Sequence, residues 1–347
     1  MTTYFSTFMS GLQEVVEEAL KKDLKNSTKI ELLLDGLVVY RSNEPPGNIK
    51  KIRFLNNTFI LFRFYQKKLS PKVLIEKVLQ EPNIITSLPL GLVKNTTRFR
   101  VIASRENQVI ALDKRLLSKI ETVLSRRLML KVNRKLPDIE VWFLTRREGY
   151  AFIGLRITKT PNYEKSLYKG ELRPELAHIM CLLADLGHQD VVLDPFAGYG
   201  SIPLECVKHF SVKQIFAGEK DKSVFRILRN KAVRHSPKLV VGNWNALNLD
   251  FLVKASIDKI ITDPPWGFYG KEKIDIVDLY KNILGEFSRI LKVNGLIVIL
   301  TAQKEIFEKL VRQLSCFNLQ KKYDILVSGK KAAIYRLKMI KSGNWQK

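Results

Sequence analysis

The stretch TDPPWG, Thr262 to Gly267, places a carboxylate, two prolines and a tryptophan directly after the apolar run IDKII. Two adjacent prolines cannot lie inside a helix or a central strand, because each has a fixed φ and lacks an N–H. The strand must therefore end at about Asp263, and a stiff loop must follow. A stiff loop that carries an acid and an aromatic side chain at a strand end predicts a place for chemistry. The alternative is a simple turn.

A second stretch, DPFAGYGS, follows an apolar strand that ends at Asp194. Its glycines let the backbone come close to a ligand, and the helix that begins at about residue 201 favours negative groups at its N-terminus. The string lacks the lysine of a phosphate-cradling loop, which argues against ATP hydrolysis. The candidate ligand-binding residues of this loop are Asp194, Pro195, Ala197, Gly198, Gly200 and Ser201.

Two further strand ends carry polar side chains. KQIFAGE ends at Glu219, where an acid can accept hydrogen bonds from both hydroxyls of a ribose; the alternative is a charge at a helix N-cap. KLVVGNW ends near Asn243 and Trp244, and Asn243 could bond an adenine edge, with Asn245 as a competitor. Ligands of doubly wound sheets bind outside the carboxyl ends of the strands, so we expect one site here.

The elements that position these residues alternate between strand and helix from residue 190 onward, which predicts right-handed βαβ units and a parallel sheet with helices on both faces. A hairpin turning at residues 328–330 is expected to close the sheet. Residues 161–175 are polar and predict a linker. Residues 1–160 predict small α+β modules with basic loops, including a hairpin at Asp35-Gly36.

The net charge of the chain is +25 and its pI is about 9.9, with the basic excess present in both halves. This favours a polyanionic partner, nucleic acid before a membrane surface; the alternative is a generally lysine-rich proteome. The three cysteines form no C-x-x-C, and the four histidines show no metal-ligand spacing, so no metal site is predicted. Neither a signal peptide nor a membrane-spanning run is apparent.

Taken together, residues 190–338 resemble class I S-adenosylmethionine-dependent methyltransferases in strand order, acidic ribose position and closing hairpin. In that class, [D/N]-P-P-[Y/F/W] marks enzymes that methylate an exocyclic amino group of a base. The class usually has Asp where Asn243 stands. Residues 1–90 resemble a ferredoxin-like segment and residues 91–160 a THUMP domain, an RNA-binding module of tRNA-modifying enzymes. YKGELRPELAHIM, residues 168–180, is similar to the lead-in of guanine-N2 methyltransferases.

The resemblance implies an α/β fold: a C-terminal Rossmann-like domain, residues 176–347, with a seven-stranded sheet, preceded by the two α+β modules. It implies a monomeric, cytoplasmic tRNA (guanine-N2)-methyltransferase with S-adenosylmethionine as cofactor. Alternatives are an rRNA guanine-N2 methyltransferase, an adenine-N6 methyltransferase of DNA or RNA, and a non-catalytic RNA-binding protein. The position methylated and the number of methyl groups stay open.

The chemistry of the loop fits that activity. An exocyclic amino group is a poor nucleophile, because its lone pair is conjugated with the ring. If the carboxylate of Asp263 and the carbonyl of Pro264 accept its two hydrogens, the lone pair can point at the methyl group, and Pro265 stiffens that carbonyl. Trp266 offers a face for a flipped base, worth roughly 1–3 kcal/mol. The expected RNA-gripping cations are Lys131, Arg134, Lys135, Arg146 and Arg147, with an ordinary solvated face as the alternative.

Overall fold

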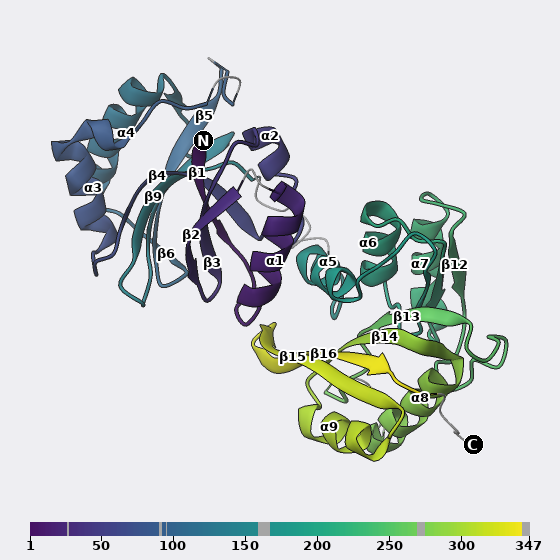
Figure 1. Cartoon of the computed structure of the whole chain (residues 1–347). Helices are drawn as coiled ribbons and strands as arrows, with labels where there is room; N and C mark the ends of the chain where they lie inside the picture. The colour runs from purple at the N-terminus through teal and green to yellow at the C-terminus, as the bar shows by residue number, and fades with distance from the viewer. Residues whose placement is uncertain (26–27, 90–91, 95, 159–166, 269–274, 342–347) are drawn as a thin grey trace. The chain divides into compact units, whose positions relative to one another are not determined.

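The structure is a computed structural model that describes residues 1–347 except 26–27, 90–91, 95, 159–166, 269–274 and 342–347. The chain divides into two units. The N-terminal unit comprises residues 1–8 and 16–161, and the C-terminal unit comprises residues 9–15 and 162–347. Each unit is built on one β-sheet (Figure 1).

The sheet of the N-terminal unit has nine strands in the order β2-β3-β1-β4-β9-β8-β5-β6, with β7 paired to β5. Residues 1–90 and 91–160 share this sheet, because β4 pairs antiparallel with β9. Phe5 stacks on Phe59 and Phe152 at ring distances of 4.3 and 5.2 Å, so aromatic side chains hold these strands together. The elements are β1 (Thr2–Thr7), α1 (Gln13–Leu24), β2 (Thr28–Leu34), β3 (Leu37–Ser42), α2 (Pro46–Ile49), β4 (Asn57–Tyr65), α3 (Pro71–Gln80), a 3-10 turn (Pro82–Ile84), β5 (Arg98–Arg105), β6 (Gln108–Ile110), α4 (Lys114–Leu128), β7 (Lys131–Val132), β8 (Ile139–Thr145) and β9 (Ala151–Arg156).

Helices α3 and α4 of this unit lie beside each other (Figure 1). Each begins at a capping side chain. The Ser70 hydroxyl accepts a hydrogen bond from the N–H of Val73, and Pro71 occupies the first helical position of α3. The Asp113 carboxylate accepts hydrogen bonds from two N–H groups at the start of α4. The local sequence therefore fixes where both helices start.

The sheet of the C-terminal unit has the order β12-β11-β10-β13-β14-β16-β15. Strands β10 to β14 pair in parallel, whereas β16 runs antiparallel to both of its neighbours. The alternation of strand and helix predicted such a mixed α/β arrangement. The elements are α5 (Pro174–Leu183), β10 (Val191–Asp194), α6 (Ser201–His209), β11 (Gln214–Gly218), α7 (Lys222–Ala232), β12 (Leu239–Gly242), β13 (Ile257–Thr262), α8 (Ile276–Ile290), β14 (Leu291–Thr301), α9 (Lys304–Gln313), β15 (Phe317–Val327) and β16 (Lys330–Met339).

Helices cover both faces of this sheet. Helices α8 and α9 lie on one face and α5 to α7 on the other (Figure 1). On the first face, Phe287 and Phe307 are fully buried in a core that also contains Leu193 of β10 and Ile260 of β13. Burying apolar side chains on both faces fixes the sheet, and with it the positions of the loops at its edge. In the part of the chain that the structure describes, no helix is long and apolar enough to cross a bilayer.

Candidate active site

The residues singled out at four strand ends lie along one edge of the C-terminal sheet. Strand β10 pairs in parallel with β11 on one side and with β13 on the other, and β12 lies beyond β11. Asp194, Glu219, Asn243 and Asp263 stand at or just after the ends of these four adjacent strands. Because parallel strands end at the same edge, these residues form a row in the spatial order Asn243, Glu219, Asp194 and Asp263.

The loop after β10 adopts the backbone that its glycines allow. Gly198 has φ 51° and Gly200 has φ 95°, both in the left-handed region that favours glycine. The N–H of Gly198 donates to Glu219 Oε2 at 3.1 Å, which ties the loop to the next strand end. A Cβ added to Gly198 would meet no atom within 4 Å. The loop therefore borders open space at the position where a ligand could approach the backbone.

The other predicted residues of this loop hold its shape. Asp194 Oδ1 accepts hydrogen bonds from the N–H of Phe196 at 3.2 Å and from the Thr262 hydroxyl at 2.8 Å. The N–H of Ala197 donates to the carbonyl of Gly218 at 2.8 Å. The carbonyl of Pro195 also borders Gly218, at 3.4 Å from an ideal Cβ there. The Ser201 hydroxyl donates to the carbonyl of Leu172 at 3.1 Å.

Asn243 and Asn245 make different contacts. The Asn243 amide donates to the carbonyls of Glu219 and Lys220 at 2.7 and 2.9 Å, so its Oδ1 is the atom left to accept a hydrogen bond from a ligand. Oδ1 of Asn245 instead accepts from the N–H of Leu247 at 3.1 Å, within a turn. An oriented amide oxygen at Asn243 offers the same acceptor as an aspartate. This geometry leaves the Oδ1 atom of Asn243, and not that of Asn245, open to a ligand.

Trp244 lies across the ends of β11 and β12. A Cβ on Gly242 would lie 1.9 Å from the indole of Trp244, and a Cβ on Gly218 would lie 3.2 Å from it. The indole also packs against Phe251 at a ring distance of 4.5 Å. Gly218 and Gly242, at the ends of β11 and β12, thus leave room for the indole of Trp244 beside Asn243.

In the loop after β13, the tryptophan contacts the acid. Trp266 Nε1 donates to Asp263 Oδ1 at 2.9 Å, so the indole edge orients the carboxylate. Gln303 Nε2 donates to the carbonyl of Trp266 at 2.5 Å, and the Tyr280 hydroxyl donates to the carbonyl of Pro265 at 3.4 Å. Among the described residues the carbonyl of Pro264 accepts no hydrogen bond. This carbonyl and the Asp263 carboxylate are therefore the acceptors that the loop has left.

Sequence reasoning missed the residues that support this loop. The Thr262 hydroxyl donates to Asp194 in the neighbouring loop. The Gln303 amide and the Tyr280 hydroxyl donate to the carbonyls of Trp266 and Pro265. Phe268 is half exposed, lies edge-on to Trp266 at 6.5 Å, and has Lys330 Nζ 3.9 Å from its ring centre. The hydroxyl directly before DPPW was a readable signal. Phe268 lies in the same loop, whereas Gln303, Tyr280 and Lys330 lie on separate elements, and no local pattern marks them.

Burial gives two carboxyl groups of the site unusual pKa values. It raises the pKa of Asp263 to about 8, partly offset by the hydrogen bond from Trp266. It raises the pKa of Asp194 to about 7, partly offset by the hydrogen bonds from Thr262 and Phe196. The pKa of Glu219 is also raised, again mainly by burial. Acids of this kind cluster at functional sites, because placing a charge out of water is otherwise costly.

The comparison with a family model decides what kind of site this is. Residues 161–331 match the family UPF0020, described as RMKL-like, methyltransferase domain. Residues 161–331 are a methyltransferase domain. The loops of Asp194 and Asp263 both lie inside the matched range.

Proteins that are similar in sequence or structure agree with the assignment of a methyltransferase domain. The tRNA (guanine(6)-N2)-methyltransferase of Thermus thermophilus is 26% identical over 64% of this chain and 68% of its own length. The human U6 snRNA (guanine-N(2))-methyltransferase THUMPD2 is 31% identical over 50% of this chain, which spans only 34% of that protein. The crystal structure of TrmN from Thermus thermophilus covers 98% of this chain and is itself covered completely, with a TM-score of 0.78 and 21% identity. The last match shows that the fold extends over both units.

The loops of the methyltransferase domain fit S-adenosylmethionine, the methyl donor of class I methyltransferases. Asp194 Oδ2 is buried without a hydrogen-bond partner among the described residues, which leaves an acceptor for a cationic group. The open space beside Gly198 lets a ligand approach the backbone, and Glu219 can offer a carboxylate to ribose hydroxyls. No group of three or more His, Cys, Asp or Glu side chains that could hold a metal occurs in the described ranges.

The segment before α5, which includes Tyr168 and Glu171, packs against the glycine loop after β10 in the methyltransferase domain. The rings of Tyr168 and Tyr199 stack at 4.2 Å with 10° between their planes. Lys231 Nζ, on α7, lies 5.3 and 5.7 Å from the two ring centres. It also donates to the carbonyl of Tyr199 at 3.0 Å and to Glu171 at 2.9 Å. The ammonium group of Lys231, on α7, therefore contacts both the segment before α5 and the glycine loop.

We expect Lys231→Met to weaken cofactor binding about tenfold while kcat at saturating cofactor stays within about twofold, because a charged hydrogen bond to the loop carbonyl is lost. Equilibrium binding of S-adenosylmethionine and steady-state kinetics would measure both. Lys231→Arg should restore most of the affinity. The matched control is Lys292→Met, which removes an ion pair with Asp258 at 2.8 Å. Equal affinity losses in both variants would show a general loss of stability instead.

The cations expected to grip RNA have two different environments. Arg134 forms a two-point ion pair with Glu121 at 2.9 and 2.7 Å. Arg146 donates to Glu148 and to the carbonyl of Asp35, and its side chain is only 9% exposed. Both arginines therefore make contacts within the N-terminal unit. The remaining three cations, Lys131, Lys135 and Arg147, form no ion pair among the described residues and keep their charge available.

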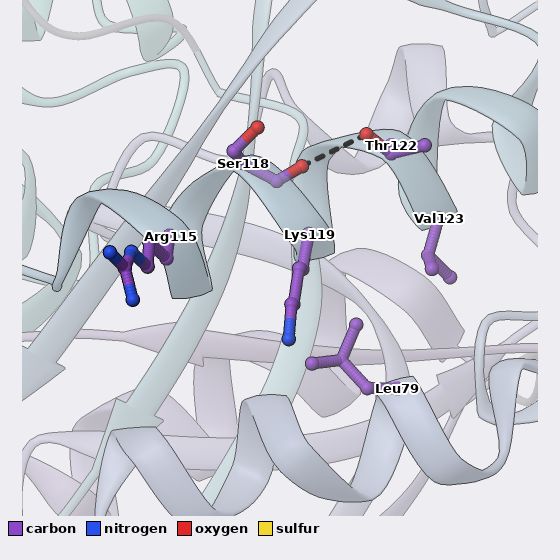
Figure 2. Close-up of a pocket in the computed structure, with 6 residues that line it drawn as sticks. All are labelled: Leu79, Arg115, Ser118, Lys119, Thr122 and Val123. Atoms are coloured by element: carbon purple, nitrogen blue, oxygen red, sulfur yellow. Dashed lines mark hydrogen bonds between the residues drawn. The ribbon is translucent and has the colours of Figure 1, made fainter.

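A hollow of about 660 Å³ lies between α3 and α4 (Figure 2). Arg115 and Lys119 lie one turn apart on its α4 side, and both are exposed. Leu79 and Val123 add apolar surface, and the Thr122 hydroxyl donates to the carbonyl of Ser118 at 3.0 Å. The hollow belongs to the N-terminal unit, whereas the strand-end loops of the candidate active site belong to the C-terminal unit.

Proposed function

We propose that the chain transfers a methyl group from S-adenosylmethionine to the exocyclic N2 amino group of a guanosine in tRNA. The observation that carries the proposal is the pair of acceptors in the loop after β13, the Asp263 carboxylate and the Pro264 carbonyl. The names of the two relatives, both guanine-N2 methyltransferases, support the atom. The Thermus thermophilus relative supports tRNA, and the human one makes another RNA the second candidate substrate.

The geometry suggests how the chain assists the reaction. Bound S-adenosylmethionine supplies an electrophilic methyl group on a sulfonium. Asp263 and Pro264 accept the two N–H hydrogens of the amino group and turn its lone pair out of conjugation. Trp266 keeps the Asp263 carboxylate in place through its indole N–H, and Gln303 keeps Trp266 in place. Most of the rate enhancement then comes from positioning, since the proton leaves only after the nitrogen has become cationic.

The ionised form of Asp263 is the form that can accept both a hydrogen bond from Trp266 and one from the substrate. Its pKa of about 8 in the free protein means that a bound cation would help to ionise it. The sulfonium of the cofactor is such a cation. A carboxylate ionised in this way would be ready to accept the amino hydrogens of the base.

The N-terminal unit is proposed to hold the RNA, with residues 1–90 as the ferredoxin-like segment and residues 91–160 as the THUMP-like domain. Support comes from Lys131, Lys135 and Arg147 and from the cationic hollow between α3 and α4. A-form RNA is recognised mainly by shape and backbone, which suits dispersed cations. The proposal includes a monomeric enzyme in the cytoplasm.

The experiment that tests the function is incubation of the protein with S-adenosylmethionine and unmodified tRNA transcripts, followed by nucleoside mass spectrometry. Parallel reactions contain U6 snRNA, rRNA fragments and duplex DNA. The expected product is N2-methylguanosine from tRNA. N2-methylguanosine only from another RNA would change the substrate, and N6-methyladenosine would contradict the assigned atom. No methylated product in any reaction, together with intact RNA binding, would favour a non-catalytic RNA-binding protein.

A further inference from the structure

Helix α7 of the methyltransferase domain begins a segment rich in cations. Residues 222–238 contain six Lys or Arg and no Asp or Glu. Lys222, Arg226 and Arg229 stand at i, i+4 and i+7, so they lie on one side of the helix. All three are exposed, whereas Leu228 and Ala232 face the interior. We call Lys222, Arg226, Arg229 and Arg234, the last in the turn after α7, the α7 stripe.

The α7 stripe keeps its charge. Among the described residues none of its four members takes part in an ion pair, whereas Lys231 on the same helix pairs with Glu171. The nearest acid in sequence, Asp221, is occupied as the N-cap, where its carboxylate accepts from the N–H groups of Ser223 and Val224. A cationic surface without paired anions attracts polyanions from solution.

His235 follows Arg234 of the α7 stripe directly in sequence. Its pKa is lowered, first by partial burial and then by the positive charges of Lys208 and Arg234. A cation makes protonation of a neighbouring imidazole less favourable, so these two charges act on His235 together. Arg234 of the α7 stripe and Lys208 thus lie close enough to His235 to act on its pKa.

The position of the α7 stripe relates it to the active site. Helix α7 starts three residues after Glu219, at the same sheet edge as the loops of Asp194 and Asp263. With 11 residues, it extends about 16 Å away from that edge. A polymer that places one nucleotide at Asp263 would have its neighbouring backbone within reach of such a helix.

We propose that the α7 stripe binds the phosphate backbone of the substrate RNA, so that the methyltransferase domain itself holds the RNA beside the nucleotide it modifies. This rests on the proposed function. Three of the four members are arginines, whose planar guanidinium groups match phosphate oxygens in two-point contacts. A membrane surface is the poorer fit, because the apolar side of α7 is buried in the domain and cannot enter lipid.

The test is a triple variant, Arg226→Gln, Arg229→Gln and Arg234→Gln, in the full chain. Binding of an unmodified tRNA transcript is measured by fluorescence anisotropy without S-adenosylmethionine, at several salt concentrations. We expect affinity at about 50 mM salt to fall about tenfold, and the slope of log Kd against log salt to decrease by about 2, since each lost phosphate contact removes about 0.7 to 0.9. The S-adenosylmethionine affinity should be unchanged, which shows that the domain is folded.

Two controls make the result specific. Lys281→Gln, Lys309→Gln and Arg312→Gln together remove the same charge from exposed positions on α8 and α9, on the opposite face of the sheet, and should leave the slope unchanged. The triple variant Arg226→Lys, Arg229→Lys and Arg234→Lys should retain most of the original slope of log Kd against log salt. An unchanged slope in the glutamine variant, or an equal decrease in the α8–α9 control, would overturn the proposal. The assay involves no methyl transfer, so failure of the proposed reaction would be seen separately.

Discussion

Replacing Asp263 by asparagine is expected to lower the rate of methyl transfer about a hundredfold to a thousandfold, the typical effect of removing one preorganised hydrogen-bonding group from an active site. The asparagine Oδ1 can still accept the hydrogen bond from Trp266 Nε1. The carboxylate Oδ2, however, is replaced by an NH2 group, which donates and therefore opposes the N–H hydrogens of the substrate. Single-turnover transfer from labelled S-adenosylmethionine to RNA would measure the change.

The cofactor affinity of this variant should stay within a few fold of the original, because Asp194 and Glu219 remain in place. Asp258→Asn is the matched control, since Asp258 lies on the same strand, β13, and pairs with Lys292 away from the strand end. We expect it to keep the transfer rate. A large loss of cofactor binding in the Asp263→Asn variant would contradict the assignment of this loop to the substrate side of the site.

The same substitution is expected to stabilise the protein against heat at alkaline pH. The pKa of Asp263 is about 8 in the folded protein, and the ordinary value of an aspartate is 3.8. Between those values the folded state binds more protons than the unfolded state, so stability falls as pH rises through this window. Above about pH 8 the folded protein must hold a buried charge, and asparagine removes that cost.

We therefore expect Asp263→Asn to raise the melting temperature by several degrees at about pH 8.5, since 1 kcal/mol shifts it by roughly 2–4 °C for a domain of this size. Near pH 4 the aspartate is already protonated in the folded state, and the two proteins should melt within about one degree of each other. Calorimetry at both values measures the difference. An equal gain at both pH values would mean that the effect arises from packing and that the carboxyl titrates normally.

The sequence predicted the row of strand-end residues because each lies directly after a short apolar run. Periodicity and the Pro-Pro and Gly-x-Gly strings suffice to locate such ends. The contacts that complete the site were not predictable in this way. Thr262 and Asp194 are 68 residues apart, and Gln303 and Trp266 are 37 apart, so only the sheet order brings them together.

The N-terminal unit shows the same limit. Two modules were predicted, at residues 1–90 and 91–160, because the strands of each follow one another in sequence. The pairing of β4 with β9 joins both segments into one sheet, and no local pattern announces it. Arg134 and Arg146 were predicted from the sequence to grip RNA. The contacts of Arg134 with Glu121 and of Arg146 with the carbonyl of Asp35 depend on how the chain folds.

The hydrogen bond from Thr262 to Asp194 has a consequence for the order of events. It binds Asp194 to the residue directly before Asp263, and a charge on Asp194 raises the pKa of Asp263. Asp194 and Asp263 both titrate near neutrality in the free protein. Arrival of a cationic donor would release protons from both groups, so its affinity should increase with pH. Such linkage favours ordered addition, in which the donor binds first and leaves the acceptor site ionised for the RNA.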